Sequence, residues 1–233
     1  MKRFCLPLVL FLTAVLSTPG AVAAPPPAGP AVALLSKVIL EVVRKEAGKN
    51  WEKAVRGQTL ASGDMLRTGP GALAIIKFKD NSLVRLREKS ELTVTGKQTG
   101  NSLSKSVEIT TGVVGFNVQK QRAGEEFRFT SPTSVASIRG TAGMLNSTPG
   151  ADTLTVTEGT VLLSNKRSSR TVDVSSGFTG ISNGDGTLRV RPSTPKEQRS
   201  ALEALRDDQR KRLDIELRDP QGKTNRLKIE YNE

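Results

Sequence analysis

The sequence contains no histidine, and this absence excludes more chemistry than any motif in the chain suggests. Histidine is the usual general base near neutral pH, the base in Ser-His and Cys-His pairs, and a common transition-metal ligand. The only cysteine, Cys5, lies in a segment that we expect to be removed, so the rest of the chain has no disulfide, thiol nucleophile or thiolate metal site. We therefore expect neither an enzyme nor a metal or cofactor.

Aromatic residues are also scarce, at 4% of the chain, with a single tryptophan. A core must then be built mainly from Val, Ile and Leu, and this favours strands over a helical bundle. A chain of 233 residues is long enough for one medium domain and an appendage.

The first 23 residues have the three parts of a secretory signal peptide. Lys2 and Arg3 form a basic start, residues 6–16 are an apolar run, and small residues precede a cleavage site between Ala23 and Ala24. The run is too short to span a bilayer, which takes about 20 residues. An uncleaved anchor is the alternative, but the early proline and late glycine argue against it. The cysteine precedes the apolar run, so the pattern is not that of a lipoprotein.

Export without disulfides favours a bacterial envelope, hence a periplasmic or secreted protein. Removing Lys2 and Arg3 leaves 33 basic and 23 acidic residues, a net charge of +10. Outside the cytoplasm, the partners of such a chain are anionic lipids, phosphate-bearing glycans and acidic protein faces, and nucleic acid is not expected. Candidate binding cations form two clusters, although most such charges are simply solvated: Lys166, Arg167 and Arg170, and then Arg199, Arg206, Arg210, Lys211 and Arg212.

The composition divides the remaining chain into three parts. Residues 24–34 are rich in Pro and Ala and are typical of a linker. Residues 35–191 consist of short runs of period-two alternation, such as Val84 and Leu86 around Arg85, separated by glycine-containing turns. The gaps are too short for βαβ crossovers, so we expect a mainly β domain, either a sandwich or a solenoid of short strands. Residues 192–233 depart from this pattern and form the third part.

This C-terminal part begins with a capping pattern. Thr194, a proline and Glu197 have the spacing of a capping box, which predicts a helix from Thr194 to about Arg212. Ala201, Leu202 and Leu205 are expected on one face of it. Residues 213–217 and 227–231 alternate as strands and predict a hairpin around residues 219–222.

The order of motifs in the β-rich part resembles the FecR family. The resemblance covers residues 37–180 and depends on six segments in the right order, not on any one of them. The positions that carry it are Trp51, Gly63, Asp64, Leu66, Thr68, Gly69, Phe78, Asp80, Ser82, Leu86, the 127–136 strand with Arg139, Gly140 and Thr141, and Gly159. It implies a stand-alone exported FecR domain in which these residues are structural.

One departure limits what the resemblance implies. Family members that regulate iron-uptake genes carry a cytoplasmic segment and a membrane span before this domain, where this chain has a signal peptide. Transmembrane control of a sigma factor is therefore not carried over. We expect a non-catalytic binding or scaffold module that docks a protein or an anionic cell-wall polymer. The alternative is a periplasmic signalling component that senses an outer-membrane receptor or envelope state.

Several motifs have both a chemical and a structural interpretation. Gly63-Asp64 could place a carboxylate in a site, but a tight turn capped by aspartate is favoured. Residues 139–141 could form an anion-binding nest, but a bulge or strand corner is favoured. Residues 183–187 resemble part of a calcium loop, yet lack its downstream glutamate, so a hairpin turn is favoured. Trp51 could stack on a sugar, but a packing role is favoured.

Two carboxylate pairs are candidates for acid–base chemistry. Glu125 and Glu126 are expected to point to opposite faces of a strand, and Asp207 and Asp208 to lie on an exposed helix face. Neither arrangement supports hydrolysis of a glycosidic bond. Gly112 and Gly159 stand between similar strand-like runs, a pattern of either a weak repeat or, more simply, the same turn chemistry used twice.

Overall fold

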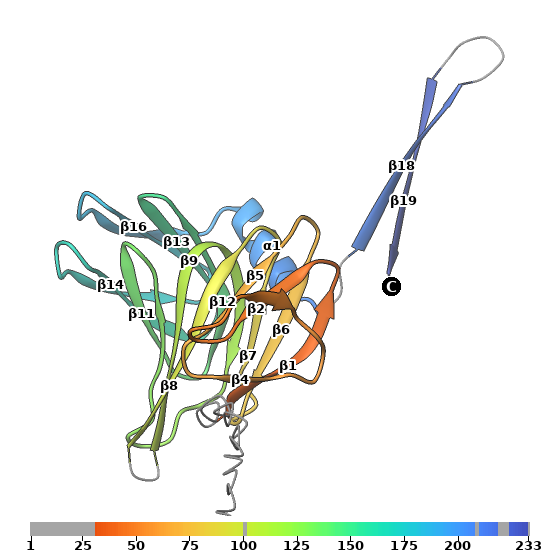
Figure 1. Ribbon diagram of the computed structural model, residues 1–233. Coiled ribbons are helices and arrows are strands. Elements are labelled where there is room, and N and C mark those ends of the chain that lie inside the picture. Colours follow the sequence, from red (N-terminus) through yellow and green to blue (C-terminus); the bar gives the residue numbers. More distant parts are fainter. Residues whose placement is uncertain (1–30, 100–101, 208–209, 219–223, 233) are drawn as a thin grey trace, which may run out of the picture.

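The computed structural model describes residues 31–99, 102–207, 210–218 and 224–232, with side chains for residues 31–97 and 104–207. The expected signal peptide and its cleavage site at Ala23 and Ala24 lie outside the described residues. The first strands are β1 Ala31–Ile39, β2 Val42–Lys45, β3 Trp51–Lys53, β4 Thr59–Ala61, β5 Asp64–Thr68, β6 Leu73–Phe78, β7 Leu83–Leu86, β8 Glu91–Thr99 and β9 Ser102–Val118. They are followed by β10 Phe127–Thr130, β11 Ser134–Ile138, β12 Thr141–Thr148, β13 Ala151–Glu158, β14 Thr160–Asn165, β15 Thr171–Ser175, β16 Phe178–Asn183 and β17 Leu188–Pro192. Helix α1 Pro195–Ala204 and a hairpin of β18 Arg210–Arg218 and β19 Thr224–Asn232 complete the chain (Figure 1).

Strands β1–β17 are hydrogen-bonded into one sheet that doubles over into two layers. Layer A has the order β4-β1-β6-β7-β9-β12-β13-β16-β17. Layer B has the order β3-β2-β5-β8-β9-β10-β11-β14-β15. Strand β9 belongs to both, because its first half pairs with β8 and β10 and its second half with β7 and β12. The prediction of a mainly β fold is confirmed.

The core lies between the two layers and is made of Val, Ile, Leu and four phenylalanines. Phe78 of layer A meets Phe127 of layer B edge-on, with ring centroids 4.9 Å apart. Phe116 of layer A lies 5.1 Å from Phe129 of layer B. Each ring is at most 1% exposed. Edge-on and offset rings add specific geometry to the burial of their area, so these contacts fix how the layers face each other.

The chain changes layer at residues that have left-handed backbone conformations. Each crossing in the described part contains one residue with positive φ: Leu40, Gly57, Gly63, Gly71, Lys89, Gly112, Gly124, Gly140, Gly159 and Gly177. At Gly112, inside β9, an added Cβ would lie 2.6 Å from the Cα of Ser90. At Gly159 it would lie 2.6 Å from Cγ2 of Thr141. Both positions therefore require glycine for space as well as for conformation. The glycines that stand in similar sequences mark equivalent corners of the chain.

The N-terminal boundary differs from the sequence-based expectation. Strand β1 begins at Ala31, so the last four residues of the expected 24–34 linker are strand, and Val32 and Ala33 are buried. These residues pair with β4 and β6 in layer A. Proline content marked the segment as linker, but small apolar residues directly after it supply an edge of the sheet.

Helix α1 begins as predicted and ends earlier. Thr194 is the N-cap, and the reciprocal contacts of a capping box with Glu197 are both present. The helix ends at Ala204 and not near Arg212, because residues 210–218 form β18. Its buried residues are Ala201 and Ala204, whereas Leu202 is 59% exposed, so Ala201 and Leu202 do not share one face as expected.

The predicted C-terminal hairpin is present and is longer than expected. Strands β18 and β19 form a separate two-stranded sheet, which stands apart from the layers in Figure 1. No helix among the described residues is long and apolar enough to cross a membrane.

Candidate functional site

The sequence-predicted cations Lys166, Arg167 and Arg170 come together at one end of the layers. They lie on the β14–β15 loop, which adjoins the β16–β17 loop, and all three are exposed. Arg167, Arg170 and also Arg189 line a shallow depression of about 650 Å³. We call Lys166, Arg167, Arg170 and Arg189 the basic tip. Arg189 was missed because it follows the 183–187 turn and is distant from the others in sequence.

Asn165 holds the two loops of the basic tip in place. Its side-chain oxygen accepts from the backbone amides of Arg167 and Ser168, each at 2.9 Å, and its amide nitrogen donates to Asn183 O at 2.8 Å. Arg167 Nη1 donates to Gly184 O at 2.8 Å. The residues expected as a hairpin turn therefore form one, and their carbonyls bind the neighbouring loop. A cationic surface held in this way loses little conformational freedom on binding.

One acidic residue lies within the basic tip. Asp185 accepts a hydrogen bond from the Thr187 amide at 2.7 Å. That contact, together with the nearby charges of Arg167 and Arg189, lowers the pKa of Asp185. The carboxyl is thus an anion at neutral pH, and it offsets one of the four positive charges.

Arg206 and Arg210 do not join this surface. Arg206 follows α1 and lines a groove of about 890 Å³ between that helix and layer A. Arg210 is the first residue of β18, so it is not on the helix as expected, and its side chain lies outside the described ones. The second predicted cluster is therefore divided among helix, loop and strand.

The groove beside α1 carries charges of both signs. Its floor includes Val113 and Met144, and its rim includes Arg87, Glu88, Lys196 and other charged residues of α1 and the strands. Glu197 binds Arg191 through two contacts of 2.7 and 2.9 Å. These contacts and the Thr194 amide lower the pKa of Glu197 to about 2. Four basic and three acidic side chains line the groove, so its positive charge is largely offset and does not select an anion.

Basic side chains from the strands hold the C-terminal end of α1. Lys37 donates to Asp207 O at 2.8 Å, Arg85 contacts the Asp207 carboxylate at 2.6 Å, and Arg87 donates to Glu203 O. The last turn of α1 has no basic residue of its own. Cations favour the carbonyl end of a helix, so Lys37 of β1, Arg85 of β7 and Arg87 directly after β7 fix the place where the chain leaves α1. Asp207 is therefore a structural anchor and does not lie on a helix face.

The motif residues Gly63 and Asp64 form a turn with a buried ion pair. Gly63 has a φ of 93° and Asp64 begins β5. Arg44 Nη2 lies 2.8 Å from Asp64 Oδ2, which also accepts from the Ala61 amide at 2.9 Å. Arg44 and Asp64 are 6% and 2% exposed. The Asp64 carboxylate thus has its partners inside the fold and does not form a surface site.

A second buried pair lies at the β6–β7 turn. Lys105, 3% exposed, donates to Asp80 at 2.6 Å, and Gln121 donates to the same oxygen at 2.9 Å. Burial acts to raise the pKa of Asp80, but hydrogen bonds, first from Lys105 and then from Gln121, outweigh it. The pKa of Asp80 is therefore lowered. The Ser82 amide adds a further hydrogen bond at 3.1 Å.

The segment around residues 131–134 surrounds another buried carboxylate. Ser131, Thr133 and Ser134 each donate a hydroxyl to Asp152 Oδ2, the last at 2.8 Å. Asp152 is 0% exposed. A carboxylate buried between two layers of strands cannot reach a substrate, so this cluster of hydroxyls around an aspartate joins the two layers.

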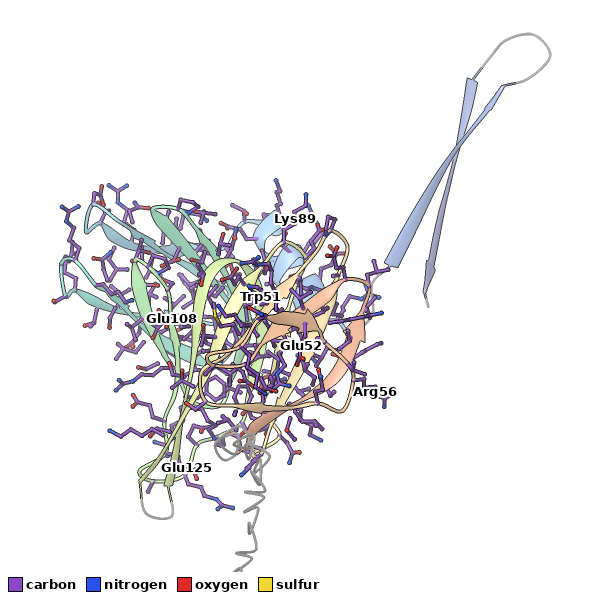
Figure 2. The ribbon with its side chains drawn as sticks, viewed as in Figure 1. Trp51, Glu52, Arg56, Lys89, Glu108 and Glu125 are labelled. Atoms are coloured by element: carbon purple, nitrogen blue, oxygen red, sulfur yellow. The ribbon has the colours of Figure 1, made fainter. Side chains whose placement is uncertain are left out.

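The remaining motif residues are also part of the framework. Gly140 lies at a crossing, and its amide donates to Gln119 O at 3.3 Å instead of facing an open nest. Arg139 is exposed and Thr141 is buried. Trp51, on β3, is half-buried with the Arg67 guanidinium 4.5 Å from its ring centroid (Figure 2). Leu66, Thr68, Phe78, Ser82 and Leu86 are all buried, and Gly69 donates its amide to Glu41 O at 2.8 Å.

The carboxylate pair Glu125 and Glu126 does not lie on a strand. Both residues precede β10 in a loop, at the end of the molecule where Figure 2 shows Glu125. Glu126 contacts Arg128 at 2.5 Å. Among the side chains that the structure describes, no group of three or more Asp, Glu, Cys or His residues is placed to hold a metal ion.

The model of the FecR protein family matches residues 64–162 of this chain. This match confirms the resemblance of the β-rich part to the FecR family. The match runs from the start of β5 to the middle of β14, and it contains the Arg139-Gly140-Thr141 corner and the hydroxyl cluster around Asp152. Strands on both sides of the matched FecR region continue the same two layers.

The chain is also similar to solved structures. Two crystal structures, at 1.65 and 2.50 Å resolution, of a protein described as a putative anti-sigma factor from Parabacteroides distasonis ATCC 8503 have a TM-score of 0.50 and 14% sequence identity with it. The likeness covers 58% of this chain and 63% and 62% of those chains. At this identity it shows a shared fold. A comparison with curated proteins found no match.

Proposed function

We propose that this chain is a non-catalytic binding module of the bacterial envelope, which docks an anionic partner through the basic tip. The observation that carries this proposal is that Arg167, Arg170 and Arg189 line one depression. The first two come from the β14–β15 loop, which also carries Lys166, and Arg189 comes from the start of β17, next to the loop that Asn165 and Gly184 hold in place. An acidic protein face and an anionic cell-wall polymer offer the same chemistry to this surface.

The placement of the acidic groups supports a non-catalytic role. Asp64, Asp80 and Asp152 are engaged by buried or half-buried partners inside the fold. General acid–base catalysis needs a group within reach of the substrate, and these carboxylates are directed between the layers. The motif residues therefore have structural roles, and the binding function is assigned to the surface.

The envelope location is part of the same proposal. The basic, apolar and small-residue segments of residues 1–23 support export with cleavage after Ala23. The FecR domain supports an envelope context as well. We place the protein in the periplasm or outside the cell.

A second candidate function is envelope signalling, in which the domain senses an outer-membrane receptor or the state of the envelope. The match to the FecR family and the fold shared with a protein described as a putative anti-sigma factor favour it. A sigma-factor or receptor gene beside the gene for this chain would support signalling. Loss of transcription of a neighbouring receptor gene on deletion of this chain would establish it, and unchanged transcription would contradict it.

The test of the docking proposal is charge reversal at the basic tip. Arg170→Glu combined with Arg189→Glu should weaken binding to an anionic wall polymer or to an acidic protein captured from envelope fractions, with the larger loss at low salt. Arg56→Glu is the matched control, because Arg56 is exposed on the opposite side of the molecule from the tip loops (Figure 2).

The two kinds of partner are separated by two measurements. Binding of a purified teichoic-acid-like polyphosphate in solution reports on polymers, and cross-linking in intact cells reports on proteins. Equal binding by the tip variant and the Arg56 control in both measurements would refute docking through this surface.

A further inference from the structure

The hairpin β18–β19 has one apolar and one charged face. Its register places Leu213 opposite Ile229 and Ile215 opposite Leu227. Opposite residues of antiparallel strands lie on the same face, and alternate residues share it. One face is therefore formed by the positions Leu213, Ile215, Leu217, Leu227, Ile229 and Tyr231, with the polar positions Lys211 and Asn225 at its two ends.

The charged face is already complementary within the hairpin. The register sets Arg212 opposite Glu230, Asp214 opposite Lys228, and Glu216 opposite Arg226. Cross-strand pairs of opposite charge are favourable in every one of these positions. Three charged pairs are therefore matched within the hairpin, with Arg210 and Arg218 at the ends of this face opposite uncharged residues, whereas the apolar face and the strand edges have no partner in the described structure.

Strand β19 pairs only with β18 in the described structure, since the two form a separate sheet. A lone two-stranded hairpin is marginally stable in water, and an unpaired edge offers its amides and carbonyls to another strand. The contacts of Lys37 and Arg85 with Asp207 fix the exit from α1, and the hairpin begins shortly after it, at Arg210, as a sheet apart from the layers (Figure 1). These properties are those of an association element.

We propose that the occupant of this edge is a second copy of the chain, with β19 paired antiparallel to β19 about a two-fold axis at Ile229. In this register Lys228 lies opposite Glu230 of the second copy, and the same pair recurs across the axis. Leu227 lies opposite Tyr231 of the second copy, so apolar positions meet apolar positions. The result is a four-stranded sheet with one continuous apolar face.

Other symmetric registers of β19 are less favourable. An axis at Lys228 places two lysines opposite each other, and an axis at Leu227 places Arg226 opposite Lys228. Like charges directly opposite each other destabilise a strand pair. Only the axis at Ile229 combines opposite charges on one face with apolar positions on the other.

The edge of β18 fits a second copy less well. An axis at Asp214 places two aspartates opposite each other, and an axis at Ile215 opposes Asp214 to Glu216. An axis at Leu213 has favourable charges but sets Lys211 opposite Ile215 on the apolar face. An axis at Leu217 sets Glu216 opposite Arg218 but overlaps only residues 216–218 of the strand. Sequence therefore selects β19 as the strand through which two copies join.

The test uses two single variants of the full-length chain, Lys228→Glu and Glu230→Lys, and their equimolar mixture. Each variant alone brings like charges together twice across the axis, so self-association should weaken about tenfold or more, as measured by sedimentation velocity. In the mixture the introduced carboxylate of one variant meets the introduced ammonium of the other. The mixture should therefore recover the dimer that neither variant forms alone.

This design separates association from damage to the hairpin. Both variants disturb the pairing of β19 with β18, and they do so equally alone and mixed, so a folding defect cannot produce recovery on mixing. Lys196→Glu, at an exposed position of α1, is the matched control and should leave the dimer unchanged. A monomeric wild-type chain, a dimer retained in both single variants, or a mixture that stays monomeric would each overturn the proposal.

Discussion

The two layers and helix α1 are held by different kinds of interaction. Between the layers, four phenylalanine rings and many Val, Ile and Leu side chains are sealed from water. The charges among them are paired, as Asp64 with Arg44 and Asp80 with Lys105, or hydrogen-bonded to hydroxyls, as Asp152. Helix α1 buries two alanines and is otherwise attached by polar contacts near the surface, from Lys37, Arg85, Arg87 and Arg191. The attachment of α1 should therefore respond to pH and to single polar substitutions that leave the layers folded.

This difference has a functional meaning. The FecR match covers strands of the layers and ends before α1. The layers supply a stable platform, whereas the helix is an adjustable connection to the hairpin. Changes in the layers should unfold the whole domain, and changes at α1 should act locally.

The largest effect is expected from Arg44→Ala. Removing the guanidinium leaves Asp64, 2% exposed, as an unpaired charge, so unfolding in urea should show a loss of about 3–5 kcal/mol. Arg128→Ala breaks the exposed contact with Glu126 and should cost at most about 1 kcal/mol. Replacing both Arg44 and Asp64 by Met and Leu should cost less than Arg44→Ala alone. Equal losses for Arg44→Ala and Arg128→Ala would contradict the buried-pair explanation.

Gly112→Ala should have the next largest effect on the layers. The alanine must adopt a φ of 100°, and its Cβ would lie 2.6 Å from the Cα of Ser90. We therefore expect the free energy of unfolding to fall by about 2–4 kcal/mol. Gly177→Ala is the control, because its φ is 83° but nothing lies within 4 Å of the added carbon. It should cost about 1–2 kcal/mol in thermal or urea unfolding. A control that is as damaging as Gly112→Ala would show that crowding at the corner is unimportant.

Thr194→Ala tests the attachment of α1. It removes the capping hydroxyl that accepts from the Glu197 amide, which should cost about 1 kcal/mol of local stability. Hydrogen exchange should accelerate in α1 and remain unchanged in β6 and β12. Thr171→Ala, at an exposed position of β15, should change neither. Faster exchange in the layers would show that helix and platform unfold together.

Acidification should produce the smallest effect at α1, beside the loss that protonation of Asp80 causes in the layers. The pKa of Glu197 is lowered from 4.5 to about 2 by Arg191 first and then by the Thr194 amide. A carboxyl with a depressed pKa stabilises the fold above the unfolded value, and the contribution is lost as the pH falls from about 4.5 towards 2. Proteolysis after α1 should therefore increase over this range. Glu197→Gln should be susceptible at neutral pH and show no such increase.

The strands were predictable where apolar residues alternate, because Val84, Leu86 and their neighbours place one face in the core. The corners were predictable from glycine, but Leu40 and Lys89 adopt the same conformation and carry no such signal. The predicted helix extends too far, to about Arg212, because apolar alternation is visible in the sequence only from Leu213, whereas β18 begins at Arg210. Local propensity does not resolve a boundary that strand pairing decides.

The buried polar groups were harder to predict. Arg44 stands two residues after Val42, and this spacing on a strand signals burial, but only the fold shows that Asp64 receives its charge. The hydroxyls of Ser131, Thr133 and Ser134 converge on Asp152 from the β10–β11 turn of the other layer, about 20 residues earlier in the sequence. For the basic tip, sequence identified the three cations of one loop and missed Arg189, because the pairing of hairpins brings the two loops together.

Strand β9 has a consequence for how the domain comes apart. Its 17 residues supply hydrogen bonds to both layers, with Gly112 at the bend between them. Neither layer can peel away while the other stays intact, since each would take part of the same strand with it. The backbone amides at the middle of β9 should be the last to exchange with deuterium, and a nick near Gly112 should dismantle the domain instead of dividing it into two folded halves.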